Sequence, residues 1–209
     1  MKLDKANAIR IVTKAAQKYD EFLNSRHFLI VYRFQKEIHY TEVGFRDFNF
    51  LHLTGIKSSL SAQSFYERCL NHRLSENDIE IDSKGKAVQK LTVLPYLHDL
   101  LYHNCMIGDF VSSGIMIRAD YFVGDTKLVL SVGFRKEKGR DCPVTLYSGD
   151  VRKLTNPTNK VLAILVRKYP EPVYRTASFV SKGIDLTELP LPEHLVSIKA
   201  DGSPDNSDS

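Results

Sequence analysis

The chain has 209 residues, of which 43% are hydrophobic and 26% are charged, as is typical of a soluble globular protein. No apolar run approaches the roughly 18 residues needed to cross a bilayer, and the amino terminus lacks the uninterrupted hydrophobic segment of a secretory signal, so we expect no membrane association and a cytoplasmic location. The formal net charge of +4 permits a polyanionic partner without requiring one.

The composition predicts one domain with a tail. A chain of this length is sufficient for a single domain of ordinary size, which we place at residues 1–183. Residues 184–209 are rich in proline, serine and aspartate with isolated leucines, which predicts an extended or disordered acidic tail whose last ten residues are disordered. The three cysteines fit neither a disulfide framework nor a zinc site, so we expect reduced thiols and no metal or other cofactor.

The first part of the chain predicts two helices and a hairpin. Residues 6–23 carry apolar side chains at helical spacing, with charged residues between them. Residues 28–34 and 38–45 are rich in β-branched and aromatic side chains and are joined by a short polar link, which predicts a β-hairpin. A further helix is expected to begin near Ser61, a suitable amino-terminal cap, with Phe65 on its inner side.

The second part predicts a helix followed by strands. Residues 87–103 are expected to form a helix that is kinked or divided at Pro95, because proline removes a helical hydrogen bond. From Met106 the chain changes to short apolar runs joined by loops that contain glycine and proline, which predicts strands at residues 115–122, 127–134, 144–148 and 161–168. Helices early and antiparallel strands late predict an α+β domain.

The segment FLHLTGIK, Phe50 to Lys57, carries the most informative polar residues. Alternation along the run predicts a strand that presents His52 and Thr54 on one face, with Lys57 just past the turn at Gly55. The alternative is that His52 is a hydrogen-bonded histidine at the edge of a core and Thr54 an ordinary strand threonine. The motif by itself suggests a site and leaves both interpretations open.

Several short motifs, taken in order, resemble the phage-associated nuclease-like domains grouped with barnase, EndoU, the colicin ribonucleases and RelE, and most closely the fourth phage-associated group. They are FLHLTGIK, the segment SAQSFYERCLNHRLSENDIEI, MIGDF, DTKLVLSVGF and EPVYRT, within about residues 45–178. The resemblance implies amino-terminal helices and a hairpin packed on a twisted antiparallel sheet of the barnase/EndoU/RelE-like kind. It also implies phage or mobile-element origin and a metal-independent, RNA-cleaving site on the exposed face of the sheet.

Metal-free RNA cleavage requires a base for the 2′-hydroxyl proton, cations for the phosphate oxygens and an acid for the leaving 5′-oxygen. His52 suits the base or the acid because imidazole titrates near neutral pH. Lys57 suits the cationic role, Thr54 can position a phosphate, and Arg118 and Arg135 could complete an anion clamp. RNA is the expected substrate because DNA lacks the 2′-hydroxyl.

Matching the family pattern to this chain gives His52, Thr54 and Lys57 as first candidates, with Arg118 next. It adds Tyr174 and Thr176 from the late VYRT motif. For these last three, the alternatives are a surface arginine paired with Asp120, a core tyrosine and a simple strand-forming threonine. Five further basic residues of the second half are expected to contact phosphates or, alternatively, to form a solvated surface: Arg135, Lys136, Arg152, Lys153 and Arg167.

Two other hypotheses remain open. The first is a catalytically inactive nuclease-like module that binds nucleic acid or a host or antidote protein. The second is an interaction protein, such as one half of a toxin and antidote pair, that docks on its partner through its flexible leucine-bearing tail. Stacking of bases on strand aromatics would support the binding module, and the candidates are Tyr121, Phe122, Phe134, Tyr147, Tyr169, Tyr174 and Phe179.

Overall fold

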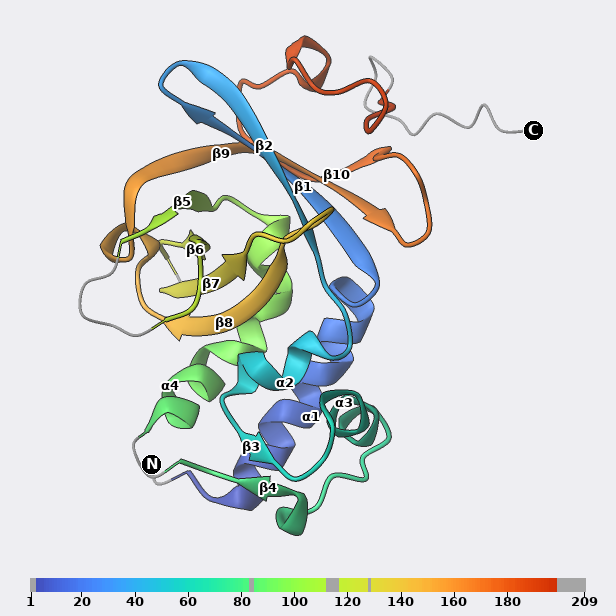
Figure 1. The fold of residues 1–209 in the computed structure, drawn as a ribbon, viewed down its shortest axis with the longest axis vertical. Coiled ribbons are helices and arrows are strands. Elements are labelled where there is room, and N and C mark those ends of the chain that lie inside the picture. The colour runs from blue at the N-terminus through green and yellow to red at the C-terminus, as the bar shows by residue number, and fades with distance from the viewer. Residues whose placement is uncertain (1–2, 83–84, 112–116, 128, 199–209) are drawn as a thin grey trace.

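The computed structural model describes residues 3–82, 85–111, 117–127 and 129–198. Within these ranges the chain forms helices packed beside a large antiparallel sheet, which confirms the predicted α+β class (Figure 1). The start of the strand predicted at residues 115–122, one residue of that predicted at 127–134, and the predicted disorder of the last ten residues lie outside the described residues.

The helices begin and end where local side chains satisfy the backbone. The Asp4 carboxylate accepts a hydrogen bond from the Asn7 N–H at the start of the first helix, and Ser61 caps the third in the same way through the Ser64 N–H. At Leu94, just before Pro95, the fourth helix changes to a 3₁₀-helix, close to the predicted interruption. The α-helices are α1 (Lys5–Phe22), α2 (Asn49–Thr54), α3 (Ala62–Leu70) and α4 (Lys86–Val93), and the 3₁₀-helices are η1 (Glu76–Asp78), η2 (Leu94–Tyr102), η3 (Val151–Lys153) and η4 (Leu186–Glu188).

The main sheet has the order β2-β1-β9-β5-β6-β7-β8, with β10 also paired to β9. The long strand β9 joins two halves of this sheet, because its first part pairs with β5 and its second part with β1 and β10. The strands are β1 (Arg26–Phe34), β2 (Glu37–Gly44), β5 (Met106–Phe110), β6 (Tyr121–Asp125), β7 (Leu130–Arg135), β8 (Cys142–Ser148), β9 (Thr155–Lys168) and β10 (Thr176–Val180), while β3 (Lys57–Ser58) and β4 (Ile79–Glu80) form a separate pair. Strands β1 and β2 pair with each other and form the predicted hairpin.

The sheet curls until its two ends meet. The Asp141 N–H donates to the Glu42 carbonyl oxygen and the Gly44 N–H donates to the Asp141 carbonyl oxygen, each at 2.9 Å. These bonds bring the start of β8 beside the end of β2, although the two strands lie at opposite ends of the strand order. The curl places residues from distant parts of the sequence around one edge.

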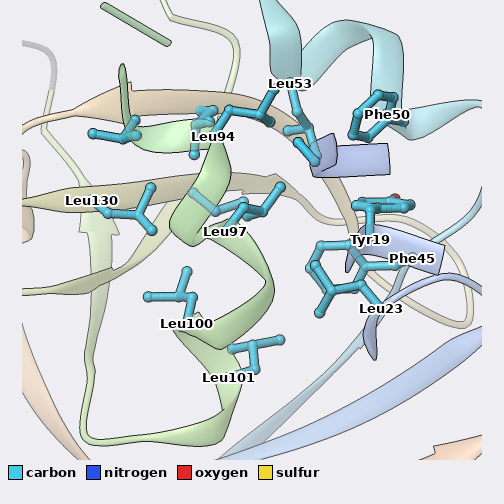
Figure 2. Packing of buried hydrophobic residues seen from close by; sticks show 14 of the residues in the cluster. Tyr19, Leu23, Phe45, Phe50, Leu53, Leu94, Leu97, Leu100, Leu101 and Leu130 are labelled. Carbon is cyan, nitrogen blue, oxygen red and sulfur yellow. The ribbon is translucent and has the colours of Figure 1, made fainter. Parts of the chain in front are cut away.

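The main core lies between the helices and one face of the sheet. Figure 2 shows leucines of η2 close to Leu130 of β7, and Tyr19 of α1 beside Phe45 and Phe50. The Tyr19 hydroxyl donates to the Arg46 carbonyl oxygen at 2.8 Å, so this buried tyrosine has a hydrogen-bond partner. Each fully buried side chain of this size contributes about 1.5–3 kcal/mol by leaving water.

The described part of the predicted tail packs on the other face of the sheet. Leu29, Ala163 and Leu165 are fully buried there together with Tyr174. Residues 184–198 cross this face as an irregular segment with one 3₁₀ turn (Figure 1), and their apolar side chains that contact the cluster are Leu186, Leu189, Leu191, Leu195, Val196 and Ile198. The leucines of the tail therefore cover apolar surface of the sheet.

The prediction of a strand at FLHLTGIK is wrong, because the run forms helix α2. Phe50 and Leu53 are both fully buried at a spacing of three residues, as on one side of a helix. Gly55 follows with φ +71°, the left-handed conformation that commonly ends a helix. Residues two apart on a helix point in different directions, so His52 is exposed while Thr54 is buried.

Candidate functional site

A cavity of about 1140 Å³ opens along β8, where α2 and α4 pack against that strand. Its lining comes from β8 itself, α2, α4, the start of β1, the end of β2 and the segment after it, the end of β7, the β7–β8 loop and residues 117–118. These segments span more than half of the sequence and meet because the sheet is curled. We refer to this cavity as the β8 groove.

The β8 groove is strongly cationic. Its described lining includes six lysine or arginine side chains and two carboxylates, Glu137 and Asp141. Glu137 pairs with Arg135 (Nη2 to Oε1, 3.1 Å), and Asp141 accepts hydrogen bonds from the hydroxyls of Thr41 and Tyr121 at 2.8 Å each. The excess of positive charge favours a polyanionic ligand, and the cations are Arg46, Lys86, Lys90, Arg118, Arg135 and Arg140.

Helix α2 places His52 at this groove beside Lys90 of α4. Lys90 Nζ donates to the His52 carbonyl oxygen at 2.9 Å, close to the carboxyl end of α2. Its stem passes Gly55, where a Cβ would lie only 2.8 Å from Lys90 Cδ. Burial, with a smaller effect from Lys86, lowers the pKa of Lys90 to about 8. Lys90 is therefore an amine that can release and regain a proton not far above neutral pH.

The groove brings together some of the predicted site residues. His52, Arg118 and Arg135 all line it. Arg118 is exposed, and within the described part of the chain it makes no ion pair; the predicted alternative partner, Asp120, instead accepts a hydrogen bond from the Lys136 N–H at 2.7 Å. Two of the first four candidates therefore lie at one site.

Thr54 and Lys57 lie outside the groove lining. The Thr54 hydroxyl donates to the Leu51 carbonyl oxygen at 2.8 Å and accepts from the Ile56 N–H at 3.0 Å, so it closes the end of α2. Lys57 is exposed on β3, in the small second sheet. The structure gives Thr54 a local structural role, because both of its hydrogen bonds are to nearby backbone.

The residues of the late VYRT motif lie elsewhere. Tyr174 is fully buried under the tail segment, and its hydroxyl donates to Glu42 Oε1 at 2.7 Å. Thr176 is exposed on β10. Neither lines the β8 groove.

Four of the five predicted phosphate contacts also fall outside the groove. Lys136 lines a separate cavity of about 80 Å³. Arg152 pairs with Asp150 (Nη2 to Oδ2, 2.5 Å) and Lys153 is exposed beside it on η3. Arg167 is buried, with Nη2 3.6 Å from Glu42 Oε1. Of this set, Arg135 alone lines the groove.

Several groove residues were missed from the sequence. Lys86 and Lys90 are four residues apart at the start of a predicted helix, a spacing that places both on one side. Arg46 lies three residues before the start of α2, and Arg140 ends the basic loop RKEKGR. His27 carried no local signal, because its position depends on the pairing of β1 with β2 and β9.

The α+β domain, with helices beside a large antiparallel sheet, is consistent with a barnase/EndoU-like nuclease fold. The family model described as phage-Barnase-EndoU-ColicinE5/D-RelE like nuclease4 (PBECR4) matches residues 11–183, so the chain belongs to this family and the predicted resemblance is confirmed. The comparisons with curated proteins and with solved structures gave no match.

Among the residues that the structure describes, no group of three or more histidine, cysteine, aspartate or glutamate side chains is arranged to hold a metal ion. None of their helices combines the length and apolar character needed to span a membrane.

Proposed function

We propose that the β8 groove binds RNA and that the domain is a metal-independent endoribonuclease of phage or mobile-element origin. The observation that carries this proposal is that six cationic side chains and His52 line the same open groove. Positive charge along an open groove suits the regularly spaced phosphates of a nucleic acid. RNA is the substrate because the reaction uses its 2′-hydroxyl as the nucleophile.

The groove supplies two proton carriers and several fixed cations. One carrier removes the proton from the 2′-hydroxyl, whose oxygen then attacks the adjacent phosphorus while the bond to the 5′-oxygen breaks. The other carrier gives a proton to the departing 5′-oxygen, which leaves a 2′,3′-cyclic phosphate. His52 and Lys90 are the candidates for these roles, and Arg118 and Arg135 stabilise the added charge on the phosphate oxygens.

Aromatic residues at the groove favour single-stranded RNA. Phe48, which precedes α2, is 52% exposed and lines the groove, as does the partly exposed Tyr147 of β8. An exposed ring beside a cationic surface can stack on an unpaired base. By contrast, Tyr121, Phe122 and Phe134 of the predicted stacking set are buried.

The alternative proposal is a nuclease-like module that binds RNA, DNA or a host or antidote protein without cleaving RNA. The observation in its favour is that Thr54, Lys57, Tyr174 and Thr176 lie outside the groove. Such a module keeps the cationic surface and lacks a complete set of reacting groups.

The test is incubation of the purified protein with total RNA in excess chelator. Three samples are compared: the wild type, His52→Ala, and His194→Ala as a matched exposed histidine outside the groove. Circular dichroism confirms that all three are folded. We expect cleavage that leaves 2′,3′-cyclic phosphate ends in the wild type and His194→Ala and is lost in His52→Ala.

Each other outcome decides against part of the proposal. Intact RNA in every sample refutes the ribonuclease reaction, and RNA affinity measured on the same samples then tests the binding module. Cleavage that the chelator abolishes refutes metal independence. Full cleavage by His52→Ala removes His52 from the mechanism.

A further inference from the structure

Three buried nitrogen atoms without a hydrogen-bond partner gather at the β2 end of the groove. Among the described residues, His27 Nδ1, Arg140 Nε and Arg167 Nε are all in this state. His27 is paired with Gly44 on β2 and with Arg167 on β9, so its ring lies on the same face of the sheet as Arg167. Buried polar atoms are nearly always hydrogen-bonded, and three unpartnered donors or acceptors in one place indicate a ligand position.

The charges around His27 favour an anion. Glu42 Oε1 lies 3.6 Å from Arg167 Nη2 and 3.8 Å from Arg140 Nε, and it also accepts the Tyr174 hydroxyl. The positive charge of a third guanidinium, that of Arg46, also lowers the pKa of His27. Glu42 is thus the one carboxylate that pairs with Arg140 and Arg167 among the described residues, whereas the Arg46 guanidinium makes no ion pair there and lies over the Tyr169 ring. Positive charge is therefore in excess around His27.

The pKa of His27 lies well below neutral pH, so its imidazole carries no charge near pH 7. The side chain is only 1% exposed, and burial followed by the charges of Arg140, Arg167 and Arg46 lowers its pKa to about 4. A neutral imidazole still has one N–H to donate. Because an anion would offset the charges of the arginines, its arrival would raise the pKa of His27.

The ring is reached from the groove across a glycine. His27, Gly44, Arg46 and Arg140 all line the β8 groove, whereas Arg167, the neighbour of His27 on β9, does not. A Cβ on Gly44 would lie 3.2 Å from His27 Cδ2 and 3.8 Å from Arg140 Cδ, so any larger residue would fill the space between the imidazole and the guanidinium. Glycine at this position therefore leaves room beside the Cδ2–Nε2 edge of the His27 ring and the stem of Arg140.

We propose that His27, Arg140 and Arg46 form a phosphate-binding subsite at the β2 end of the β8 groove, with Arg167 contributing positive charge from outside the groove lining. The subsite holds one phosphate oxyanion, which accepts the imidazole N–H and guanidinium N–H groups. That this phosphate belongs to RNA rests on the proposed function. The same chemistry would also fit free or terminal phosphate, and the experiment separates these sources.

The first measurement follows the histidine ring signals of the wild-type protein by NMR. Inorganic phosphate is added at constant ionic strength, with chloride as the control salt. We expect the His27 signals to shift with phosphate only, and the pKa of His27 to rise from about 4 by about one unit or more. His27 signals that stay unmoved, or that respond equally to chloride, overturn the subsite.

Variants test the same contact by affinity. His27→Gln, which cannot carry a charge, should bind phosphate about tenfold or more weakly, because a hydrogen bond to a charged group is lost or weakened. His39→Gln is the control, since His39 is partly exposed on β2, stacks on Tyr32 and lies outside the groove. Unchanged phosphate affinity in folded His27→Gln overturns the proposal. If that variant does not fold, the wild-type titration decides.

A 2′-O-methyl oligonucleotide, which cannot be cleaved by 2′-hydroxyl attack, identifies the source of the phosphate. A His27 shift with the oligonucleotide lacking a 5′-phosphate places an internal phosphodiester in the subsite. A shift only with inorganic phosphate or the 5′-phosphorylated form makes it a monoester site. Both results support the subsite. If the protein cleaves RNA but the NMR signals of His27 do not shift, the subsite alone is refuted. If the His27 signals shift but the protein cleaves no RNA, the ribonuclease proposal alone is refuted.

Discussion

Replacing Thr54 by valine separates a structural role for this residue from a role at the site. The substitution removes the hydroxyl that accepts from the Ile56 N–H at 3.0 Å and donates to the Leu51 carbonyl oxygen at 2.8 Å, and keeps a side chain of similar size. Thr54 is fully buried, so water cannot replace the lost partner of the Ile56 N–H. We expect the free energy of unfolding to fall by about 2 kcal/mol and the melting temperature by about 4–8 °C.

The assay is urea unfolding of the wild type, Thr54→Val and Thr54→Ser, with RNA affinity measured on the same samples. Thr54→Ser keeps the hydroxyl and should retain more of the stability. RNA affinity should be unchanged in both, because Thr54 does not line the β8 groove. A valine variant with wild-type stability and reduced RNA affinity would refute this reasoning and return Thr54 to the site.

Three other predictions concern the groove and the tail. Because the pKa of Lys90 is about 8 in the folded chain against its usual 10.5, stability should rise as pH increases above about 8, and urea unfolding of Lys90→Met at several pH values should show that rise lost. Fluorescence anisotropy should show RNA affinity about tenfold lower in Arg118→Glu, whereas Lys57→Glu, outside the groove, should stay within about twofold; equal losses would contradict the groove assignment. Truncation after Ile184 uncovers Leu29 and the apolar cluster around it, so thermal unfolding should show a loss of at least about 2 kcal/mol, and an unchanged melting temperature would contradict the packing of the tail.

The elements with a long regular pattern were predictable. Helix α1 and the β1–β2 hairpin have enough residues for their periods of 3.6 and 2 to be distinguished. The run FLHLTGIK is shorter, and its apolar residues at positions 50, 51 and 53 fit both periods. The run forms a helix because Phe50 is buried beside Tyr19 of α1, and this contact joins residues far apart in the sequence.

The site was predicted only in part for a related reason. His52 and Arg118 could be chosen by their chemistry and by the family resemblance, and both line the groove. Arg46 and Arg140 reach it through the closure between β2 and the start of β8, which no local pattern encodes. For the same reason Tyr174 could not be placed, since its motif gives no sign of the tail that covers it.

The position of β9 determines when the groove can exist during synthesis of the chain. Among the described strands, β9 alone pairs with both β1 and β5, and its register joins Lys168 to Arg26 across most of the protein. Until the ribosome has added β9, the early hairpin and the later strands lack the strand that joins them into one sheet. Contacts between such distant residues also slow folding. A chain that ends before β9 would therefore carry FLHLTGIK, Arg118 and Arg135 without the sheet that holds them around one groove.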